Sequence, residues 1–270
     1  MEEIAYSKIN LALHVRSRQA DGYHEIETVF AFAEDGDRLS VRESDRLALE
    51  LEGPFAAALA GDNLVSRAAE ALRSHYAVRK GAALILDKRL PVASGIGGGS
   101  ADAAAALRLL VRWWRLPYEE AVLHRIAASL GADVPACLRS EYSRGTGRGD
   151  QLAASNAGEF AGMPLLLVNP GVPVSTGAVF AAWNGEDRGP LPSSPLHGRN
   201  DLEAAALSLA PEIGEVLEAI AGCTGVVLSR MSGSGATCFA LFRAQEDAER
   251  AAGRIGGSHP HWWRLSTRLR

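Results

Sequence analysis

Cysteine and lysine are both scarce in this chain of 270 residues. The three cysteines, Cys137, Cys223 and Cys238, are far apart and form no C-x-x-C pair. This spacing argues against a disulfide framework and against a zinc site, so we expect free, buried thiols. Lysine occurs only at positions 8, 80 and 88 among 28 basic residues, which makes each lysine a candidate for a specific role.

Long hydrophobic runs and clusters of basic residues are also missing. No apolar stretch approaches the roughly 20 residues of a membrane-spanning helix, and the amino terminus is acidic where a signal peptide would be basic. The net charge of −4 and the scattered arginines argue against nucleic-acid binding. These features predict a cytoplasmic protein that binds neither nucleic acid nor a membrane, and they show no sign of an obligate protein partner.

The chain is long enough for two lobes, because 270 residues of which 47% are hydrophobic can bury more than one core. Glycines and polar residues interrupt the segment 143–162, which is the best candidate for a boundary. We therefore expect an N-terminal lobe of residues 1–150 and a C-terminal lobe of residues 151–270.

The most informative segment is rich in glycine. It lies between a strand predicted over residues 83–86 and a helix predicted from about Ser100 to before Pro117. Glycine lets several backbone N–H groups approach one anion, and a helix N-terminus adds the positive end of its dipole. The segment therefore predicts a cradle for nucleotide phosphates made by Pro91, Val92, Ala93, Ser94, Gly95, Ile96, Gly97, Gly98, Gly99, Ser100 and Ala101.

Other readings of this segment fit less well. A flexible linker does not usually run into an alanine-rich helix. No G-K-[ST] follows the glycines, and the dinucleotide pattern G-x-G-x-x-G would need glycine where Ser100 stands. The cradle therefore belongs to neither of the two best-known phosphate loops.

The pattern of the amino-terminal region predicts a β-hairpin or two nearby strands. Residues 4–15 alternate in polarity, which predicts a half-buried strand with Lys8 and Asn10 on the same face. Asp21-Gly22 predicts a turn, and residues 25–32 a second strand. Lys8 and Asn10 are thus expected to project side by side.

Elements further along the chain follow from periodicity and from breakers. Helices are expected from Asp62 or Asn63 to His75, over residues 118–130, and after a cap at Asn200-Asp201. Strands are expected over residues 163–168, 226–231 and 237–242, with a second glycine turn at 232–235. Pro135 predicts that Val134 stays out of helical torsions, so that Asp133 lies on a constrained turn between two elements.

Phosphoryl transfer needs bound phosphates, a carboxylate near the acceptor hydroxyl and a cation against the developing charge. Asp133 is the carboxylate that we select and Lys8 the cation. The alternative for Asp133 is an ordinary Asx turn or helix cap, and the alternative for Lys8 is a solvated strand residue.

Seven motifs together resemble the GHMP kinase superfamily, and within it the family of 4-diphosphocytidyl-2-C-methyl-D-erythritol kinases. They occur in the order of that family and span residues 4–242: S-K-I-N-L-A-L-H-V at Ser7, D-G-Y-H-E-I-E-T-V-F at Asp21, P-V-A-S-G-I-G-G-G-S-A-D-A-A at Pro91, L-G-A-D-V-P at Leu130, N-P-G-V-P-V-S-T at Asn169, N-D-L-E at Asn200 and M-S-G-S-G-A-T-C-F at Met231.

The resemblance implies a two-lobed α+β fold with the glycine-loop nucleotide site between the lobes. It implies transfer of the γ-phosphate of ATP, with Mg²⁺, to the tertiary 2-hydroxyl of the erythritol unit, as part of the non-mevalonate isoprenoid route. Lys8 and Asp133 match the residues that act at this hydroxyl in the family. The metal ligands stay unassigned, because Asp102 would repel phosphate unless it points away or faces Mg²⁺.

The cytidine end of the substrate is read in this family by aromatic and polar side chains. The matching positions are Tyr23, His24 and Phe180, while Asn10 and Thr176 are expected to line the acceptor cleft. Aromatic faces grip a pyrimidine and polar groups check its edge. The alternatives are core packing for Phe180 and a hydrogen-bonded surface position for His24.

Two other functions are compatible with these motifs. The first is another GHMP kinase, acting on a mevalonate-type alcohol or on homoserine. The second is a non-catalytic nucleotide-binding regulator, although the combination of Lys8 with Asp133 argues against it.

Overall fold

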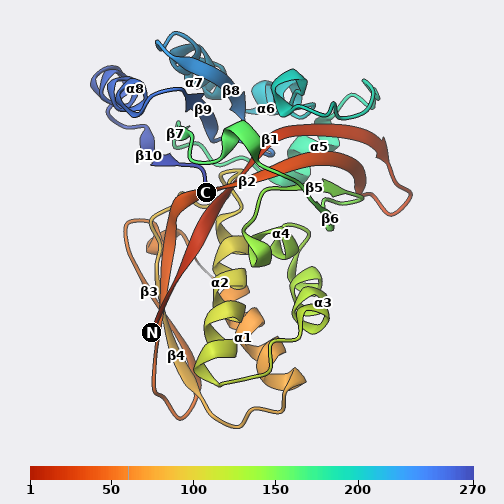
Figure 1. Cartoon of the computed structure of the whole chain (residues 1–270), viewed down its shortest axis with the longest axis vertical. Coiled ribbons are helices and arrows are strands. Elements are labelled where there is room, and N and C mark those ends of the chain that lie inside the picture. Colours follow the sequence, from red (N-terminus) through yellow and green to blue (C-terminus); the bar gives the residue numbers. More distant parts are fainter. Residues whose placement is uncertain (60) are drawn as a thin grey trace. The chain divides into compact units, whose positions relative to one another are not determined.

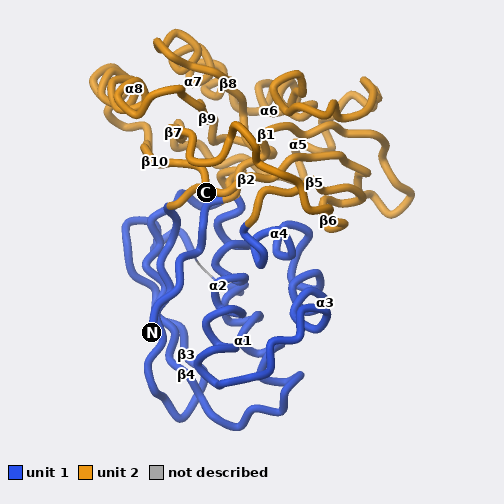
Figure 2. Tube along the Cα trace, in the orientation of Figure 1, with its two compact units in different colours: residues 1–7, 35–92, 97–140 blue, residues 8–34, 93–96, 141–270 orange. Residues whose placement is uncertain are grey.

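The computed structural model describes residues 1–59 and 61–270. The chain forms two compact units, neither of which is continuous in sequence (Figure 2). Unit 1 consists of residues 1–7, 35–92 and 97–140, and unit 2 of residues 8–34, 93–96 and 141–270. The two compact units divide the chain differently from the expected lobes, and the chain enters unit 2 for the last time after Ser140. The lobe boundary at residue 150 remains a prediction.

Two long strands contribute to both units: β1 (Glu2–Arg18) and β2 (His24–Arg42). They pair with each other, and the turn between them is closed by a hydrogen bond from the N–H of Gln19 to the carbonyl of Tyr23. The hairpin is confirmed, and β2 is ten residues longer at its end than predicted.

The expectation of a half-buried β1 is wrong. Every residue from Ser7 to Val15 is buried, on both faces of the strand. The polar side chains of Lys8, Asn10 and His14 are among them. Alternating polarity therefore marks two buried faces here, one apolar and one hydrogen-bonded.

Unit 1 packs helices beside a small group of strands (Figure 1). Within it, β4 pairs antiparallel with the second part of β2 and parallel with β3. Helix α2 packs against α1 and α4, and its residues from Ala101 to Leu107 are all buried, because alanine lets neighbouring elements approach closely. The remaining elements of this unit are β3 (Leu47–Glu52), α1 (Leu64–His75), β4 (Ala82–Asp87), α2 (Gly98–Trp113), α3 (Glu120–Leu130) and α4 (Val134–Arg139).

Unit 2 contains an antiparallel sheet of order β10-β7-β9-β8, against which α7 and α8 pack. Its apolar core joins this sheet to α5, α6 and the end of β1. The elements are β5 (Ser143–Thr146), β6 (Gln151–Ala154), β7 (Pro164–Asn169), α5 (Thr176–Ala182), α6 (Glu203–Leu209), α7 (Glu212–Ala221), β8 (Val226–Met231), β9 (Cys238–Phe242), α8 (Gln245–Ser258) and β10 (Trp263–Arg268).

Several local expectations are confirmed. Asn63 is the cap of α1, since its side chain accepts a hydrogen bond from the N–H of Val65 at 2.8 Å. The strands predicted near residues 83, 163, 226 and 237 are β4, β7, β8 and β9. The three cysteines are free.

Two local expectations are wrong, and one hairpin was not predicted. Within residues 143–162, the segment expected to hold the boundary, β5 and β6 form a hairpin that pairs with β2. Helix α6 is capped at Leu202, and Asn200 instead accepts a hydrogen bond from the Leu202 N–H. Val134, expected to stay out of helical torsions, is the first residue of α4, because proline is tolerated in the first turn, where its missing N–H would be unpaired. Asp133 lies on a turn between α3 and α4, as expected.

Within residues 1–59 and 61–270, none of the helices combines the length and the hydropathy needed to cross a membrane.

Candidate active site

The first part of the glycine loop, residues 93–96, is held in unit 2 by backbone hydrogen bonds. The carbonyl of Ile96 accepts from the N–H of Lys8, and the carbonyl of Ser94 accepts from the N–H of Thr237, each at 3.0 Å. The hydroxyl of Ser232 donates to the carbonyl of Gly95 at 2.9 Å. Two glycine motifs that lie far apart in sequence therefore meet beside β1.

Gly95 shows why this approach needs glycine. Its φ is +76°, and a Cβ added there would lie 2.3 Å from the carbonyl oxygen of Ser232. A side chain would force apart the loop and the turn at 232–235. The glycine pattern is thus explained by close packing of two backbones as well as by access for an anion.

Lys8 lies beside this junction. Its Nζ donates to Oδ1 of Asn10 at 2.8 Å and lies 5.5 Å from the centroid of the Phe30 ring. Only 3% of Lys8 is exposed, so it is not a solvated strand residue. An ammonium in such surroundings carries a strong local field, because little water screens it.

Asn10 connects Lys8 to the second glycine turn. Its Nδ2 donates to the hydroxyl of Thr28 at 2.8 Å, and its backbone N–H donates to the hydroxyl of Ser232 at 3.2 Å. The hydroxyl of Thr28 in turn donates to the carbonyl of Ala12. The side-chain oxygen, the side-chain nitrogen and the backbone N–H of Asn10 thus each have a partner, which fixes the amide oxygen that accepts from Lys8.

The second part of the loop begins α2 in unit 1. Gly97, with φ of +65°, is the residue before the helix, and no side chain in the described part of the chain caps it. The N–H groups of an uncapped first turn lack acceptors and carry the positive end of the helix dipole. This helix end therefore fits the phosphates of a nucleotide.

A buried ion cluster of Lys88, Asp37 and Asp102 lies at the start of α2. Nζ of Lys88 is 2.6 Å from Oδ2 of Asp37 and 2.6 Å from Oδ2 of Asp102, and each of these side chains is at most 3% exposed. A Cβ added at Gly98 would lie 3.0 Å from the same Nζ. Asp102, whose orientation the sequence left open, therefore points to Lys88.

The cluster has unusual proton affinities. Burial, together with the Asp37 charge and against the effect of Lys88, raises the pKa of Asp102 to about 7. Burial lowers the pKa of Lys88, but the two carboxylates outweigh it and hold that pKa above its ordinary value. Lys88 therefore stays charged. Oδ1 of Asp102 is buried and has no hydrogen-bond partner in the residues described.

Asp133 precedes α4 in unit 1. It occupies the capping position, but its side chain makes no capping hydrogen bond, so the helix-cap reading does not explain it. Lys8 belongs to unit 2, and its approach to Asp133 stays a prediction.

The residues expected to read a pyrimidine gather in unit 2. The ring of His24 lies 4.9 Å from that of Phe180 and 5.6 Å from that of Trp183. His24 is 8% exposed and is not a surface residue, whereas Tyr23 is 53% exposed with Arg148 3.7 Å from its ring centroid. Burial, followed by the charge of Arg18, lowers the pKa of His24 and keeps it neutral.

Phe180 and Thr176 come from α5. Phe180 is half-buried and packs against the core of unit 2, so the core-packing interpretation holds for part of its ring. Thr176 is exposed, and its Oγ1 lies 2.9 Å from the hydroxyl of Ser234 in the second glycine turn. The structure therefore links α5 both to the aromatic group and to the glycine turn.

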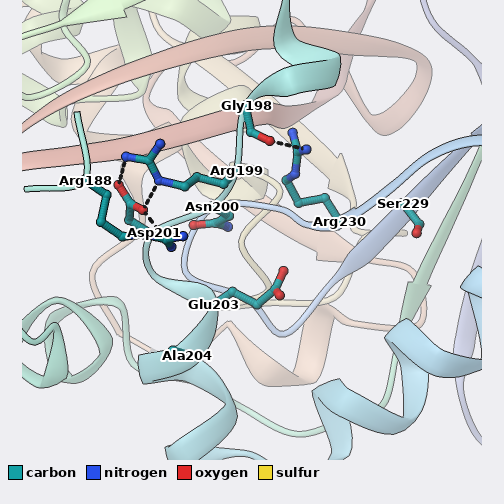
Figure 3. Close-up of a pocket in the computed structure, with 9 residues that line it drawn as sticks. All are labelled: Arg188, Gly198, Arg199, Asn200, Asp201, Glu203, Ala204, Ser229 and Arg230. Atoms are coloured by element: carbon teal, nitrogen blue, oxygen red, sulfur yellow. Dashed lines mark hydrogen bonds and ion pairs between the residues drawn. The ribbon is translucent and has the colours of Figure 1, made fainter. Parts of the chain in front are cut away.

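A pocket of about 280 Å³ in unit 2 holds none of the predicted residues (Figure 3). Asp201 binds Arg199 at 2.6 Å, and Arg230 donates to the carbonyl of Gly198 at 2.6 Å. Arg230 also donates to the carbonyls of Leu11 and Pro195. These arginines tie loops to β1, which is a structural role.

Sequence reasoning missed Asp37, Arg18, Arg148 and Trp183. Lys88 was marked only by the scarcity of lysine. No motif singles out Asp37, because its partner Lys88 lies 51 positions later.

Comparisons with known proteins agree with this arrangement. Residues 63–141 match the GHMP kinases N terminal domain and residues 193–260 the GHMP kinases C terminal domain. The 4-diphosphocytidyl-2-C-methyl-D-erythritol kinase of Rhizorhabdus wittichii is 56% identical over 99% of this chain and 94% of its own length. That of Parvibaculum lavamentivorans is 48% identical over 97% and 95%. The chain belongs to this family of GHMP kinases.

Solved structures show the same fold. A crystal structure of 4-(cytidine 5'-diphospho)-2C-methyl-D-erythritol kinase matches with a TM-score of 0.83 and 33% identity, covering 100% of this chain and 99% of that one. A homoserine kinase from Cytophaga hutchinsonii matches with a TM-score of 0.70 at 16% identity, over 97% and 95%. The GHMP kinase fold, a two-domain α+β arrangement, is therefore confirmed, and the chain is a small-molecule kinase.

The ion cluster yields a stability prediction. We expect Lys88→Met to lower the free energy of unfolding by about 3 kcal/mol or more, because two carboxylates lose their buried counterion. Lys80→Met, which removes an exposed lysine, is the matched control and should stay within about 0.5 kcal/mol. Urea unfolding at pH 7 measures both. Equal effects of the two substitutions would contradict a stabilising role of Lys88.

Asp102 yields a prediction on pH. An acid with a higher pKa in the folded protein binds its proton more tightly there, so its contribution to stability falls as pH rises from 3.8 to about 7 and then levels off. Asp102→Asn removes this titration and keeps an acceptor for Lys88. The difference in unfolding free energy between variant and wild type should therefore change across this range in favour of the variant. A constant difference from pH 4 to pH 7 would refute the assignment.

Proposed function

We propose that this kinase transfers the γ-phosphate of ATP, with Mg²⁺, to the 2-hydroxyl of 4-(cytidine 5'-diphospho)-2-C-methyl-D-erythritol. The products are the 2-phosphate and ADP, as in the non-mevalonate isoprenoid route. The observation that carries the proposal is the junction in unit 2, where residues 93–96, the second glycine turn and the Lys8–Asn10 pair share hydrogen bonds. Two relatives that match nearly the whole chain, at 56% and 48% identity, bear the name 4-diphosphocytidyl-2-C-methyl-D-erythritol kinase, which supports this reaction.

The nucleotide fits the glycine loop from Pro91 to Ala101. The uncapped start of α2 supplies N–H donors and the positive end of a dipole, which suit the phosphates of ATP. Mg²⁺ neutralises phosphate charge and is usually held through those phosphates and one or two carboxylates. In this arrangement the protein need not supply all the metal ligands itself. Within residues 1–59 and 61–270, no group of three or more Asp, Glu, His or Cys side chains is arranged to hold a metal ion.

Lys8 and Asp133 act at the acceptor in this proposal. Asp133 accepts a hydrogen bond from the 2-hydroxyl and takes up its proton as the new oxygen–phosphorus bond forms and the bond to ADP breaks. The ammonium of Lys8 stabilises the negative charge on the hydroxyl oxygen. Asn10 orients Lys8, and Thr176 lines the cleft beside the second glycine turn.

Tyr23, His24 and Phe180 form the proposed base site. The matched domains at 63–141 and 193–260 support a division of the chain near residue 150, with the nucleotide bound by residues 1–150 and the acceptor covered by residues 151–270.

Turnover of alternative alcohols tests the substrate. In a coupled assay of ADP release, kcat/KM should be at least about a hundredfold higher for the cytidine substrate than for mevalonate or homoserine. These two alcohols lack the base that His24 and Phe180 are proposed to contact. Similar kcat/KM values for all three alcohols would assign the chain to another GHMP kinase activity.

The role of Asp133 gives a second test. We expect Asp133→Asn to bind ATP normally and to lose about three orders of magnitude or more in kcat, because the amide cannot take up the proton. Glu141→Gln, at an exposed carboxylate eight positions later, is the control and should retain full turnover. Binding is measured by calorimetry and turnover by ADP release. Turnover of Asp133→Asn close to wild type would exclude Asp133 as the acceptor-side group.

A further inference from the structure

Arg18 holds the imidazole of His24 in one orientation. Its Nε donates to Nε2 of His24 at 3.2 Å, and its Nη2 donates to the carbonyls of Phe180 and Ala181 at 3.4 and 3.1 Å. The guanidinium thus connects the end of β1 to the start of β2 and to α5. Because it is planar, it fixes the direction of all three hydrogen bonds.

Packing prevents the imidazole from turning away. The Phe180 ring lies at a 41° tilt and the Trp183 ring meets it edge-on at 80°. Trp183 is itself buried in the core of unit 2. His24 is therefore enclosed by two aromatic rings and one guanidinium.

The donor in the Arg18–His24 hydrogen bond decides the tautomer. Arginine has only donors, so Nε2 must be the acceptor and carries no proton. In the neutral ring the proton is then on Nδ1. Within the described residues, Nδ1 of His24 has no hydrogen-bond partner. It is also not one of the fully buried polar atoms that lack a partner, so it is accessible to a ligand. His24 therefore presents an N–H donor to whatever occupies the site.

A fixed donor distinguishes two pyrimidines. At ring position 3, cytosine has an unprotonated nitrogen that accepts a hydrogen bond, whereas uracil has an N–H that donates one. A donor that faces position 3 pairs with cytosine and opposes uracil. A buried donor left facing another donor costs roughly tenfold to a hundredfold in affinity.

We infer that Arg18 is a positioning residue for base specificity. Its guanidinium can only donate hydrogen bonds, so its bond to Nε2 holds His24 as the Nδ1–H tautomer. This tautomer selects cytosine over uracil. This inference rests on the proposed cytidine substrate. Without Arg18, His24 can place its proton on Nε2 and offer Nδ1 as an acceptor, which uracil can satisfy.

The tautomer is measured first, without any substrate. Two-bond ¹H–¹⁵N correlation spectra of the ¹⁵N-labelled protein distinguish the two neutral forms, and His24→Gln identifies the signals of His24 among the seven histidines. We expect Nδ1–H in wild type and a mixture containing Nε2–H in Arg18→Met. Arg18→Lys, which keeps a donor, should restore Nδ1–H in part. A wild-type signal from Nε2–H would overturn the inference.

Base selectivity is measured next. The ratio of dissociation constants for uridine and cytidine 5'-monophosphates, and the ratio of kcat/KM for the cytidine and uridine forms of the acceptor alcohol, should both fall about tenfold or more in Arg18→Met. Arg16→Met is the matched control, because Arg16 lies on the same strand and pairs with Glu27 and Asp187. It should leave both ratios unchanged.

The outcomes separate the inference from the proposed function. If the acceptor alcohols are not phosphorylated, the substrate proposal fails, while the spectra and the monophosphate binding still test Arg18. If the cytidine alcohol is phosphorylated but Arg18→Met keeps the wild-type selectivity in a folded protein, the role of Arg18 is refuted and the function stands.

Discussion

The buried pairing of Lys88 with Asp37 and Asp102 is the constraint on which the proposed nucleotide site of this molecule depends. Charges this deeply buried are costly unless each one is paired, so the three side chains must keep their positions together. Asp37 comes from β2 and Asp102 from α2, and Oδ1 of Asp37 also accepts from the backbone N–H groups of Arg89 and Leu90. The cluster thus ties a strand, the entry to the glycine loop and the first turn of a helix to one point. The uncapped N–H groups of that turn belong to the proposed phosphate site, so the cluster determines where the positive end of the helix stands.

In unit 2, neutral hydrogen-bonding groups hold the first part of the glycine loop in place. Residues 93–96, β1 and the turn at 232–235 are joined by backbone hydrogen bonds and by the hydroxyl of Ser232. Asn10 is bound at both its amide and its backbone, and its amide oxygen accepts a hydrogen bond from the ammonium of Lys8. This neutral amide fixes the direction of the Lys8 ammonium without adding a charge of its own.

The sequence predicted most elements of the fold because their signals are local. Apolar periodicity and flanking glycine or proline located β4, β7, β8, β9 and α1. The hairpin β5–β6 was missed because its glycines and short polar side chains look like those of a loop, and its pairing with β2 is long-range. Burial of Lys8 and His24 was not predictable from polarity, since a hydrogen-bonded buried residue and a solvated one have the same letter. Asp37 and Arg18 lacked any motif, because each acts through a partner that only the fold brings near.

The β1–β2 hairpin also sets a distance within unit 2. Thr28, which binds Asn10, lies four residues from His24 along β2, or about 13 Å at the usual rise of a strand. Lys8 is bound to the same Asn10, so the reactive end and the base end of the proposed site are fixed on one pair of strands. A substrate anchored by its base at His24 has its far end carried toward Lys8 by the length of its linker. In the proposed site, the binding energy of the base would serve to place the hydroxyl, so an alcohol without the nucleotide would lose reaction rate as well as affinity.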